Sequence, residues 1–217
     1  MNTENDELAG LLEPVAELAQ LAGEKILAVY NSDEFSVEEK SDKSPLTAAD
    51  LASHHAIVDG LTALTPDIPI LSEESASLPF AERSAWPRYW LVDPLDGTRE
   101  FIKRNGEFTV NIALIEDGIA VLSVVHVPVT GVSYLACKGL GAFKQEGAGE
   151  RRAISVRKLG AGPLMVVGSR SHRGASLDAF LEQLGPVEML AMGSSLKFCI
   201  VAEGKAGLVH TYIHPPG

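Results

Sequence analysis

The sequence predicts a layered α/β protein, in which helices pack on a mixed β-sheet. Three observations favour this class: a long amphipathic segment near the start, a run of consecutive strands in the middle, and alternating strand and helix patterns after it. Hydrophobic residues make up 46% of the 217 residues, which is enough for a packed core and excludes disorder as the dominant state.

Each element is predicted from its local pattern. Helical spacing of apolar residues predicts helices over 8–30, 47–64, 177–184 and 195–202. Short apolar runs bounded by turn residues predict strands over 68–71, 89–92, 108–115, 120–127, 132–136 and 164–167. Residues 37–43 are charged and predict an exposed hairpin or loop. On the second helix, the face expected to be apolar carries Leu51, His55, Val58 and Leu61.

The formal charge of −11 and the absence of any basic run longer than Arg151-Arg152 argue against nucleic acid as a partner. The longest apolar stretch, 119–129, is too short to cross a bilayer, so no integral membrane segment is expected. Cys137 and Cys199 follow no metal-binding pattern and predict core residues in a reducing compartment. The polar, acidic start of the chain is unlike a signal peptide. We expect a cytoplasmic protein, with peripheral association at the inner membrane left open.

The segment Asp93-Pro94-Leu95-Asp96-Gly97-Thr98 follows a buried-looking strand and carries the sharpest chemical signal. Its two carboxylates and the Leu95 carbonyl can emerge on one rim, and hard cations such as Mg²⁺ prefer oxygen ligands of this kind. The amides of Gly97 and Thr98 can hold a phosphate if a helix begins there. An Asx-turn with helix caps is the alternative, because Asp-Pro and Asp-Gly are common turn pairs.

Further acids accompany this segment. Glu73 and Glu74 end the preceding strand, where the alternative is a solvated loop, and Asp50 begins a helix, where the alternative is a capping role. If these groups share one rim with Asp93 and Asp96, bound cations are the natural compensation for their repulsion. Several Mg²⁺ ions can activate water and neutralise a leaving oxygen, which predicts a phosphomonoesterase.

Residues 72–74, at the end of one predicted strand, and residues 90–101, which include the acidic segment, together resemble the first signature of the inositol monophosphatase superfamily. Other segments resemble its bacterial CysQ-type bisphosphate nucleotidase branch in particular: 44–50, 101–111 and 193–199. The resemblance covers about residues 11–207. It implies an αβαβα sugar-phosphatase-like sandwich. It also implies hydrolysis of the 3'-phosphate of adenosine 3',5'-bisphosphate to AMP and phosphate, which recycles a by-product of sulfate activation, with sensitivity to lithium.

The resemblance also implies roles for the acidic residues. Glu73, Asp93 and the Leu95 carbonyl would hold one Mg²⁺, and Asp93 and Asp96 would contribute to a second. Glu73, with Asp50 nearby, would serve a third, weaker ion and the attacking water. Thr98 matches the threonine that orients or deprotonates this water, with Asp50 as its carboxylate partner. The phosphate would rest at Leu95, Asp96, Gly97 and Thr98.

For the nucleotide end, the resemblance implies a role for His172 near the base or ribose, and for Ser194 and Lys197 at the second phosphate. From the residues alone, His172 reads as a surface loop residue and Lys197 as a solvated helix residue. His54 and His55 read as packing or surface residues rather than ligands. An inositol or sugar phosphatase, and a non-catalytic remnant that binds metal or nucleotide, are the alternatives to a nucleotidase. A homodimer is compatible with all three.

The predicted domain organisation is a metal-binding α+β part over 1–150 and a C-terminal α/β part over 151–217 that we expect to be incomplete. Family members continue into a Trp-Asp signature whose Asp completes the second metal site. Here the last Asp is Asp178 and the last Trp is Trp90, and 208–217 does not resemble the family. We therefore expect a missing C-terminal strand and helix, weaker binding of the second Mg²⁺ and lower activity.

Overall fold

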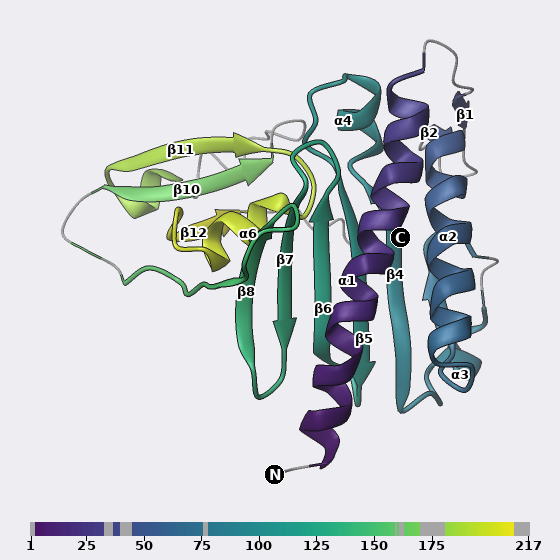
Figure 1. Cartoon of the computed structure of the whole chain (residues 1–217). Coiled ribbons are helices and arrows are strands. Elements are labelled where there is room, and N and C mark those ends of the chain that lie inside the picture. Colours follow the sequence, from purple (N-terminus) through teal and green to yellow (C-terminus); the bar gives the residue numbers. More distant parts are fainter. Residues whose placement is uncertain are drawn as a thin grey trace. The chain divides into compact units, whose positions relative to one another are not determined.

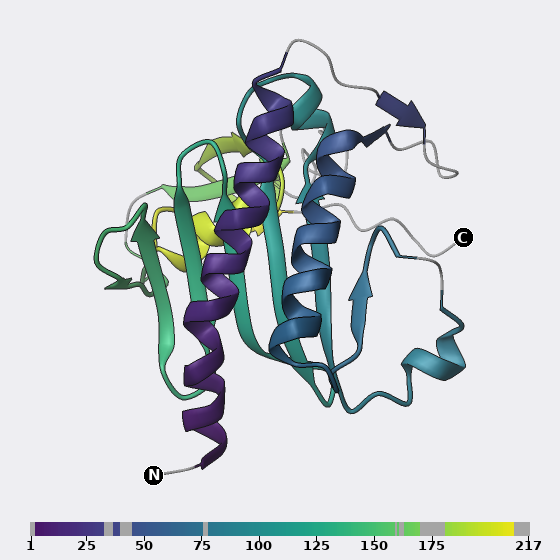
Figure 2. The same ribbon diagram turned by 45° about the vertical axis from the view of Figure 1, so that its right-hand side comes forward.

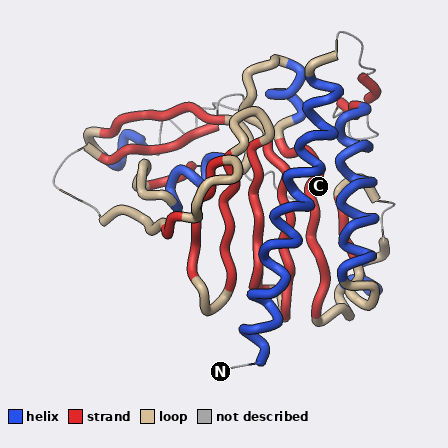
Figure 3. The backbone as a smooth tube through the Cα atoms, in the orientation of Figure 1, coloured by secondary structure: helices blue, strands red, loops and turns tan. Residues whose placement is uncertain are grey.

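The computed structural model describes residues 3–32, 37–39, 45–75, 78–158, 160, 163–169 and 181–210. The chain forms two compact units, Met1–Ala153 and Ile154–Gly217. Both units combine strands with helices (Figures 1 and 3). The mixed α/β class predicted from the sequence is therefore confirmed.

The first unit is built from two long helices, two short helices and nine described strands. Its helices are α1 (Thr3–Tyr30), α2 (Ala48–Leu64), α3 (Phe80–Arg83) and α4 (Thr98–Ile102). Its strands are β1 (Val37–Glu39), β2 (Pro45–Thr47), β3 (Ile70–Ser72), β4 (Arg88–Asp96), β5 (Thr109–Glu116), β6 (Ile119–Val127), β7 (Val132–Cys137), β8 (Gly141–Glu146) and β9 (Arg152–Ala153).

Seven of these strands form one sheet in the order β3-β4-β5-β6-β7-β8-β9. The β3–β4 pair is parallel and every later pair is antiparallel, so the sheet continues as a meander from β4 onward. Helices α1 and α2 lie side by side on one face of this sheet, as Figures 1 and 2 both show. Strands β1 and β2 pair with each other in a separate antiparallel ribbon.

The core of the first unit lies between the two long helices and the sheet. Apolar residues of α1 repeat at helical spacing, and Leu8, Val15 and Ile26 are fully buried, whereas Leu21 of the same repeat is 44% exposed. Trp90 of β4 is fully buried, and its indole N–H donates a 2.8 Å hydrogen bond to Thr65 Oγ1 at the end of α2. This bond satisfies the one polar atom of a large core side chain.

The buried face of α2 differs from the predicted one. Leu51 and His55 are exposed, whereas Asp50, Ser53 and Ile57 are buried on the face toward the sheet. The helix is thus rotated so that polar residues near its start face the strands. Leu61 is the one residue of the predicted apolar face that is fully buried. The expected hairpin or loop over 37–43 overlaps the paired strand β1 and also residues outside the described ones.

Five strands were not predicted from the sequence: β2, β8 and β9 in the first unit, and β11 (Val187–Met192) and β12 (Leu208–His210) in the second. β8 has no fully buried residue and β9 is exposed, so neither carries a run of apolar residues. The strand predicted over 89–92 is longer than expected, because β4 continues through Asp96. Its pairing with β5 shifts register between Asp93 and Asp96, which marks an irregularity where the chain leaves the regular sheet.

The second unit contains a small parallel sheet. Its strands are β10 (Leu164–Ser169), β11 (Val187–Met192) and β12 (Leu208–His210), in the order β11-β10-β12, with helix α6 (Leu196–Ala202) between β11 and β12. Parallel strands need a crossover, and α6 supplies one of them. The core includes Val167, Ile200 and Ala206. Of the helix expected over 177–184, residues 181–184 are helical and the rest lie outside the described part.

Candidate functional site

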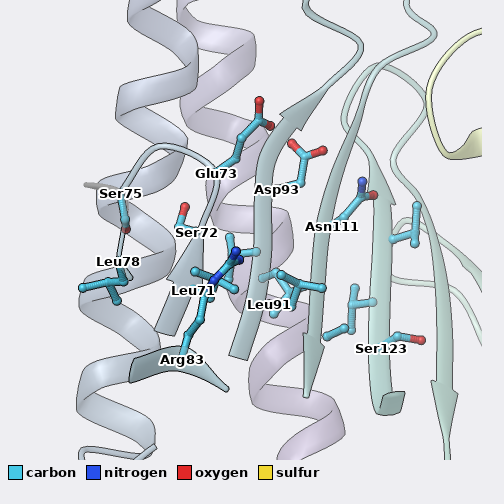
Figure 4. A pocket seen from close by; sticks show the side chains of 15 residues that line it. Leu71, Ser72, Glu73, Ser75, Leu78, Arg83, Leu91, Asp93, Asn111 and Ser123 are labelled. Carbon is cyan, nitrogen blue, oxygen red and sulfur yellow. The ribbon is translucent and has the colours of Figure 1, made fainter. Parts of the chain in front are cut away.

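The parallel pairing of β3 and β4 brings two acidic residues to the same sheet edge. Ser72 pairs with Val92, and the amide of the next residue, Glu73, donates a 3.0 Å hydrogen bond to the Val92 carbonyl. Glu73 therefore follows β3 at the level where Asp93 follows Val92 in β4. Figure 4 shows their two carboxyl groups close together at one end of a pocket. This adjacency was expected from the sequence only if the two strands were neighbours.

Asp96 and the start of α4 follow within the same segment. Asp93 lies opposite Asn111 of β5, and Asp96 lies opposite Thr109 beyond the register shift. Gly97 then has φ 97°, in the left-handed region that a residue with a Cβ rarely adopts, and α4 begins at Thr98 as predicted. The hydroxyl of Thr98 donates a 3.4 Å hydrogen bond to the Leu95 carbonyl.

Asp50 reaches the cluster from α2. It lies in the first turn of this helix and is only 2% exposed. One turn later, Ser53 is fully buried, and its hydroxyl donates a 2.8 Å hydrogen bond to the Pro94 carbonyl. This bond joins α2 to the Asp93–Asp96 segment, so the helix that carries Asp50 is held against the strand that carries the other acids.

The charges of three other acids act on the buried carboxyl of Asp93. The pKa of Asp93 is raised from 3.8 to about 9, first by burial, then by the charges of Asp96, Glu73 and Asp50, and by a side-chain hydrogen bond with Glu73. Asp93 Oδ1 is buried and has no hydrogen-bond partner among the described residues. A buried carboxylate oxygen without a donor is costly, and the cost is relieved when a proton or a cation binds.

These donors fit a hard divalent cation in chemistry. They are carboxylate oxygens with a backbone carbonyl nearby, and one of the oxygens is buried and lacks a partner. In the described part of the chain, however, no three His, Cys, Asp or Glu side chains are arranged so that they could hold a metal ion.

Sequence reasoning missed the polar residues that support this cluster. His54 Nδ1 is hydrogen-bonded to Ser72 Oγ at 2.9 Å, so α2 also contacts the end of β3. Burial is the main cause that lowers the pKa of His54, followed by the charge of His55. Ser53 and His54 follow Asp50 by three and four positions, which places all three on one helix face. This spacing is the signal that could have identified them.

A pocket of about 650 Å³ adjoins Glu73 and Asp93 on the sheet surface. Figure 4 shows the two acids and Asn111 toward one end and Arg83 of α3 toward the other, with Leu91 beside the Arg83 side chain. The pocket combines an apolar floor with polar groups, which is the usual character of a small-molecule site. The acidic cluster therefore has room beside it for a ligand.

Two predicted nucleotide contacts lie in the second unit. Ser194 has φ 49°, an uncommon value for a residue with a side chain, and accepts a 3.2 Å hydrogen bond from the Leu196 amide. Lys197 is only 8% exposed, and its ammonium group donates to the Ser194 carbonyl. The alternative of a solvated helix residue is thus wrong for Lys197. His172 lies outside the described residues.

Two further expectations concern cysteines and membranes. Cys137 and Cys199 are free and buried, as their apolar surroundings predict. Among the residues that the structure describes, no helix combines the length and the apolar character that crossing a membrane requires.

Comparison with known proteins places this geometry in a family. The inositol monophosphatase family model matches residues 7–214, a range that includes part of the 208–217 segment expected to depart from the family. The 3'(2'),5'-bisphosphate nucleotidase CysQ of Escherichia coli K12 is 54% identical over 199 residues, which is 91% of this chain and 79% of that protein.

Solved structures agree with this match. The crystal structure of CysQ from Bacteroides thetaiotaomicron has a TM-score of 0.76 and 40% identity, covering 89% of this chain and 77% of its own. Inositol monophosphatase from Anabaena has a TM-score of 0.72 and 25% identity, covering 92% of this chain and 73% of its own. The chain belongs to the inositol monophosphatase family.

Proposed function

We propose that this protein is a Mg²⁺-dependent 3'(2'),5'-bisphosphate nucleotidase, a phosphomonoesterase that converts adenosine 3',5'-bisphosphate to AMP and phosphate. The observation that carries this proposal is the cluster of Asp50, Glu73, Asp93 and Asp96, in which the buried Oδ1 of Asp93 has no hydrogen-bond partner among the described residues. The 54% identity to CysQ nucleotidases, against 25% to inositol monophosphatase from Anabaena, favours the nucleotide substrate.

The acidic residues would hold two to three Mg²⁺ ions. Glu73, Asp93 and the Leu95 carbonyl form the first proposed ligand set, and Asp93 with Asp96 contributes to the second. Glu73 with Asp50 serves the third. When bound, magnesium supplies a Lewis acid that lowers the pKa of water and stabilises charge on a leaving oxygen.

The remaining steps belong to the chain's own groups. The Thr98 hydroxyl, which lies 3.4 Å from the Leu95 carbonyl, orients the attacking water, and the Asp50 carboxylate accepts its proton. The backbone at Gly97 and Thr98, with Leu95 and Asp96, seats the phosphate that is transferred. Gly97 has no side chain, so the backbone of this left-handed turn can approach a phosphate closely.

For the nucleotide end we propose Ser194 and Lys197 at the second phosphate and His172 near the base or ribose. Lys197 supports this role because its side chain is mostly buried and its ammonium group donates to the Ser194 carbonyl, which brings the two proposed contacts together. The two free, buried thiols support a cytoplasmic location.

A substrate panel tests the proposal. Phosphate release is measured from adenosine 3',5'-bisphosphate, AMP and inositol 1-phosphate, in millimolar Mg²⁺ and in EDTA. We expect turnover of the bisphosphate that requires Mg²⁺ and is lost in Asp93→Asn, whereas Asp67→Asn, which removes an exposed acid, behaves as wild type. Preference for inositol 1-phosphate would favour the related phosphatase, and nucleotide binding without turnover would favour the non-catalytic alternative. Turnover in EDTA would refute the metal assignment.

A further inference from the structure

Two polar residues of α2 connect this helix to both acidic strand ends. Ser53 and His54 lie one turn after Asp50, on the side of the helix that faces the sheet. Ser53 is fully buried, although serine is mostly found at the protein surface. Its buried hydroxyl is satisfied by one hydrogen bond.

The Ser53 bond acts on the backbone between two proposed ligands. Its acceptor, at 2.8 Å, is the carbonyl of Pro94, which lies between Asp93 and Leu95. Because the peptide group is planar, holding the Pro94 carbonyl fixes the plane of the bond that joins Pro94 to Leu95. This contact therefore restricts the orientation available to the Leu95 carbonyl, which is itself the acceptor of the Thr98 hydroxyl.

The His54 bond acts on the other acidic segment. Its Nδ1 lies 2.9 Å from Ser72 Oγ, and Ser72 is only 5% exposed. The next residue is Glu73, whose amide is bonded to the Val92 carbonyl in β4. The residue before Glu73 is thus fixed from α2, while Glu73 itself is fixed from β4.

We propose that Ser53 and His54 are positioning residues, which set the placement of Asp50 relative to Glu73 and to the Asp93–Leu95 backbone. This inference rests on the proposed function, because it concerns how the chain shapes its metal-binding carboxylates. The described bonds of these two side chains go to other residues and not to the acidic groups themselves. They act through the Pro94 carbonyl and through Ser72, in the way that outer hydrogen bonds orient the ligands of a metal site.

The structure supplies a matched control for the loss of a helix-to-strand bond. Thr65, at the end of α2, accepts a 2.8 Å hydrogen bond from the Trp90 indole of β4. Thr65→Val and Ser53→Ala each remove one bond between α2 and β4, at opposite ends of the helix. Both changes should lower the melting temperature, so a purely structural role for Ser53 predicts the same behaviour in both variants.

The test measures Mg²⁺ affinity without substrate, by adding Mg²⁺ to EDTA-treated protein and following its thermal stability. The half-saturating concentration, at which half of the native protein holds the ion, is the Kd obtained by fitting the stability gain to its logarithmic dependence on Mg²⁺ concentration. We expect the half-saturating Mg²⁺ concentration to rise about tenfold in Ser53→Ala and in His54→Leu. His54→Asn, which can place an amide group near the position of Nδ1, should recover most of the affinity. In Thr65→Val the half-saturating concentration should stay at the wild-type value. If Ser53→Ala does not fold, the comparison of His54→Leu with His54→Asn decides the question.

The possible outcomes distinguish failure of the positioning role from failure of the proposed metal site. If Mg²⁺ fails to stabilise the wild type, or stabilises Asp93→Asn equally, the proposed metal site is wrong. If wild type responds, Asp93→Asn does not, and Ser53→Ala and His54→Leu bind Mg²⁺ as Thr65→Val does, the metal site stands and the positioning role is overturned. Failure of His54→Asn to recover affinity while His54→Leu loses it would also overturn the role of the Ser72 bond.

Discussion

Replacing Asp93 with Asn should stabilise the metal-free protein, although it removes a proposed metal ligand. The structure holds this carboxyl in its neutral form, because burial and the charges of Asp96, Glu73 and Asp50 raise its pKa to about 9. In the unfolded chain the same group is ionised at pH 7, so folding must take up a proton. An amide of nearly the same shape needs none.

The magnitude follows from linkage. The ordinary carboxyl pKa is 3.8, and pH 7 lies about 3 units above it, at about 1.4 kcal/mol a unit. The neutral carboxyl therefore costs at most about 4 kcal/mol at pH 7. This limit depends on the ordinary pKa rather than on the raised value. We expect a gain of about 2 kcal/mol, since the new amide must find its own partners, which corresponds to about 4–8 °C for a chain of this size.

The sign gives the pH dependence. A raised carboxyl pKa has no cost below the ordinary value, and the cost grows as pH rises toward about 9. The advantage of Asp93→Asn over wild type should therefore be larger at pH 8 than at pH 5. Urea or thermal unfolding in EDTA measures it, and Asp67→Asn controls for the loss of one negative charge at an exposed position. A variant less stable than wild type in EDTA, or one matching Asp67→Asn, would refute the reasoning.

Three other predictions concern the proposed water-orienting residue and the packing of α1. Thr98→Ala should lower kcat for phosphate release by about 100-fold or more with little change in melting temperature, and Thr98→Ser should retain most activity; equal kcat values in the two variants would contradict this. Burial lowers the pKa of His126 from 6.5 to about 4, so the free energy of unfolding should fall by about 3 kcal/mol as pH drops from above 6.5 to 4. Urea unfolding of wild type and His126→Asn across this range measures the fall. The same pH dependence of stability in both proteins would contradict the prediction. A Cβ at Gly23 would lie 2.7 Å from the His126 ring, so Gly23→Ala should lower the free energy of unfolding by about 1–3 kcal/mol. Gly10→Ala, whose Cβ would have nothing within 4 Å, should be neutral or stabilising. Equal melting temperatures of the two variants would contradict the prediction and show that the ring moves aside.

The acidic segment could be predicted from the sequence because its signal is local. Asp93 and Asp96 lie at the end of β4, directly after its apolar residues, and Gly97 with Thr98 marks the start of a helix, so residue order alone places these groups together. The place of Glu73 required one further assumption, that two strands pair in parallel. The structure satisfies it through the Ser72–Val92 register.

The orientation of α2 could not be predicted because tertiary contacts override its apolar pattern. Leu51 is 39% exposed, while Ser53 is fully buried, since a buried carbonyl of β4 satisfies its hydroxyl. A prediction from apolar periodicity places every polar residue on the exposed face, because burying it without a partner is costly. Periodicity carries no information about a hydrogen-bond partner 41 residues away in the chain. The partners of Ser53 and His54 become visible only when the sheet is in place.

The central claim is that carboxylates from α2, the end of β3 and β4 together hold hard cations beside a phosphate seat. Crystals soaked in Mn²⁺, which shares the oxygen-ligand preference of Mg²⁺, test it directly through anomalous scattering. We predict peaks within coordination distance of Glu73, Asp93 and Asp96. Mn²⁺ bound elsewhere on the protein, with none between these three carboxylates, would contradict the account.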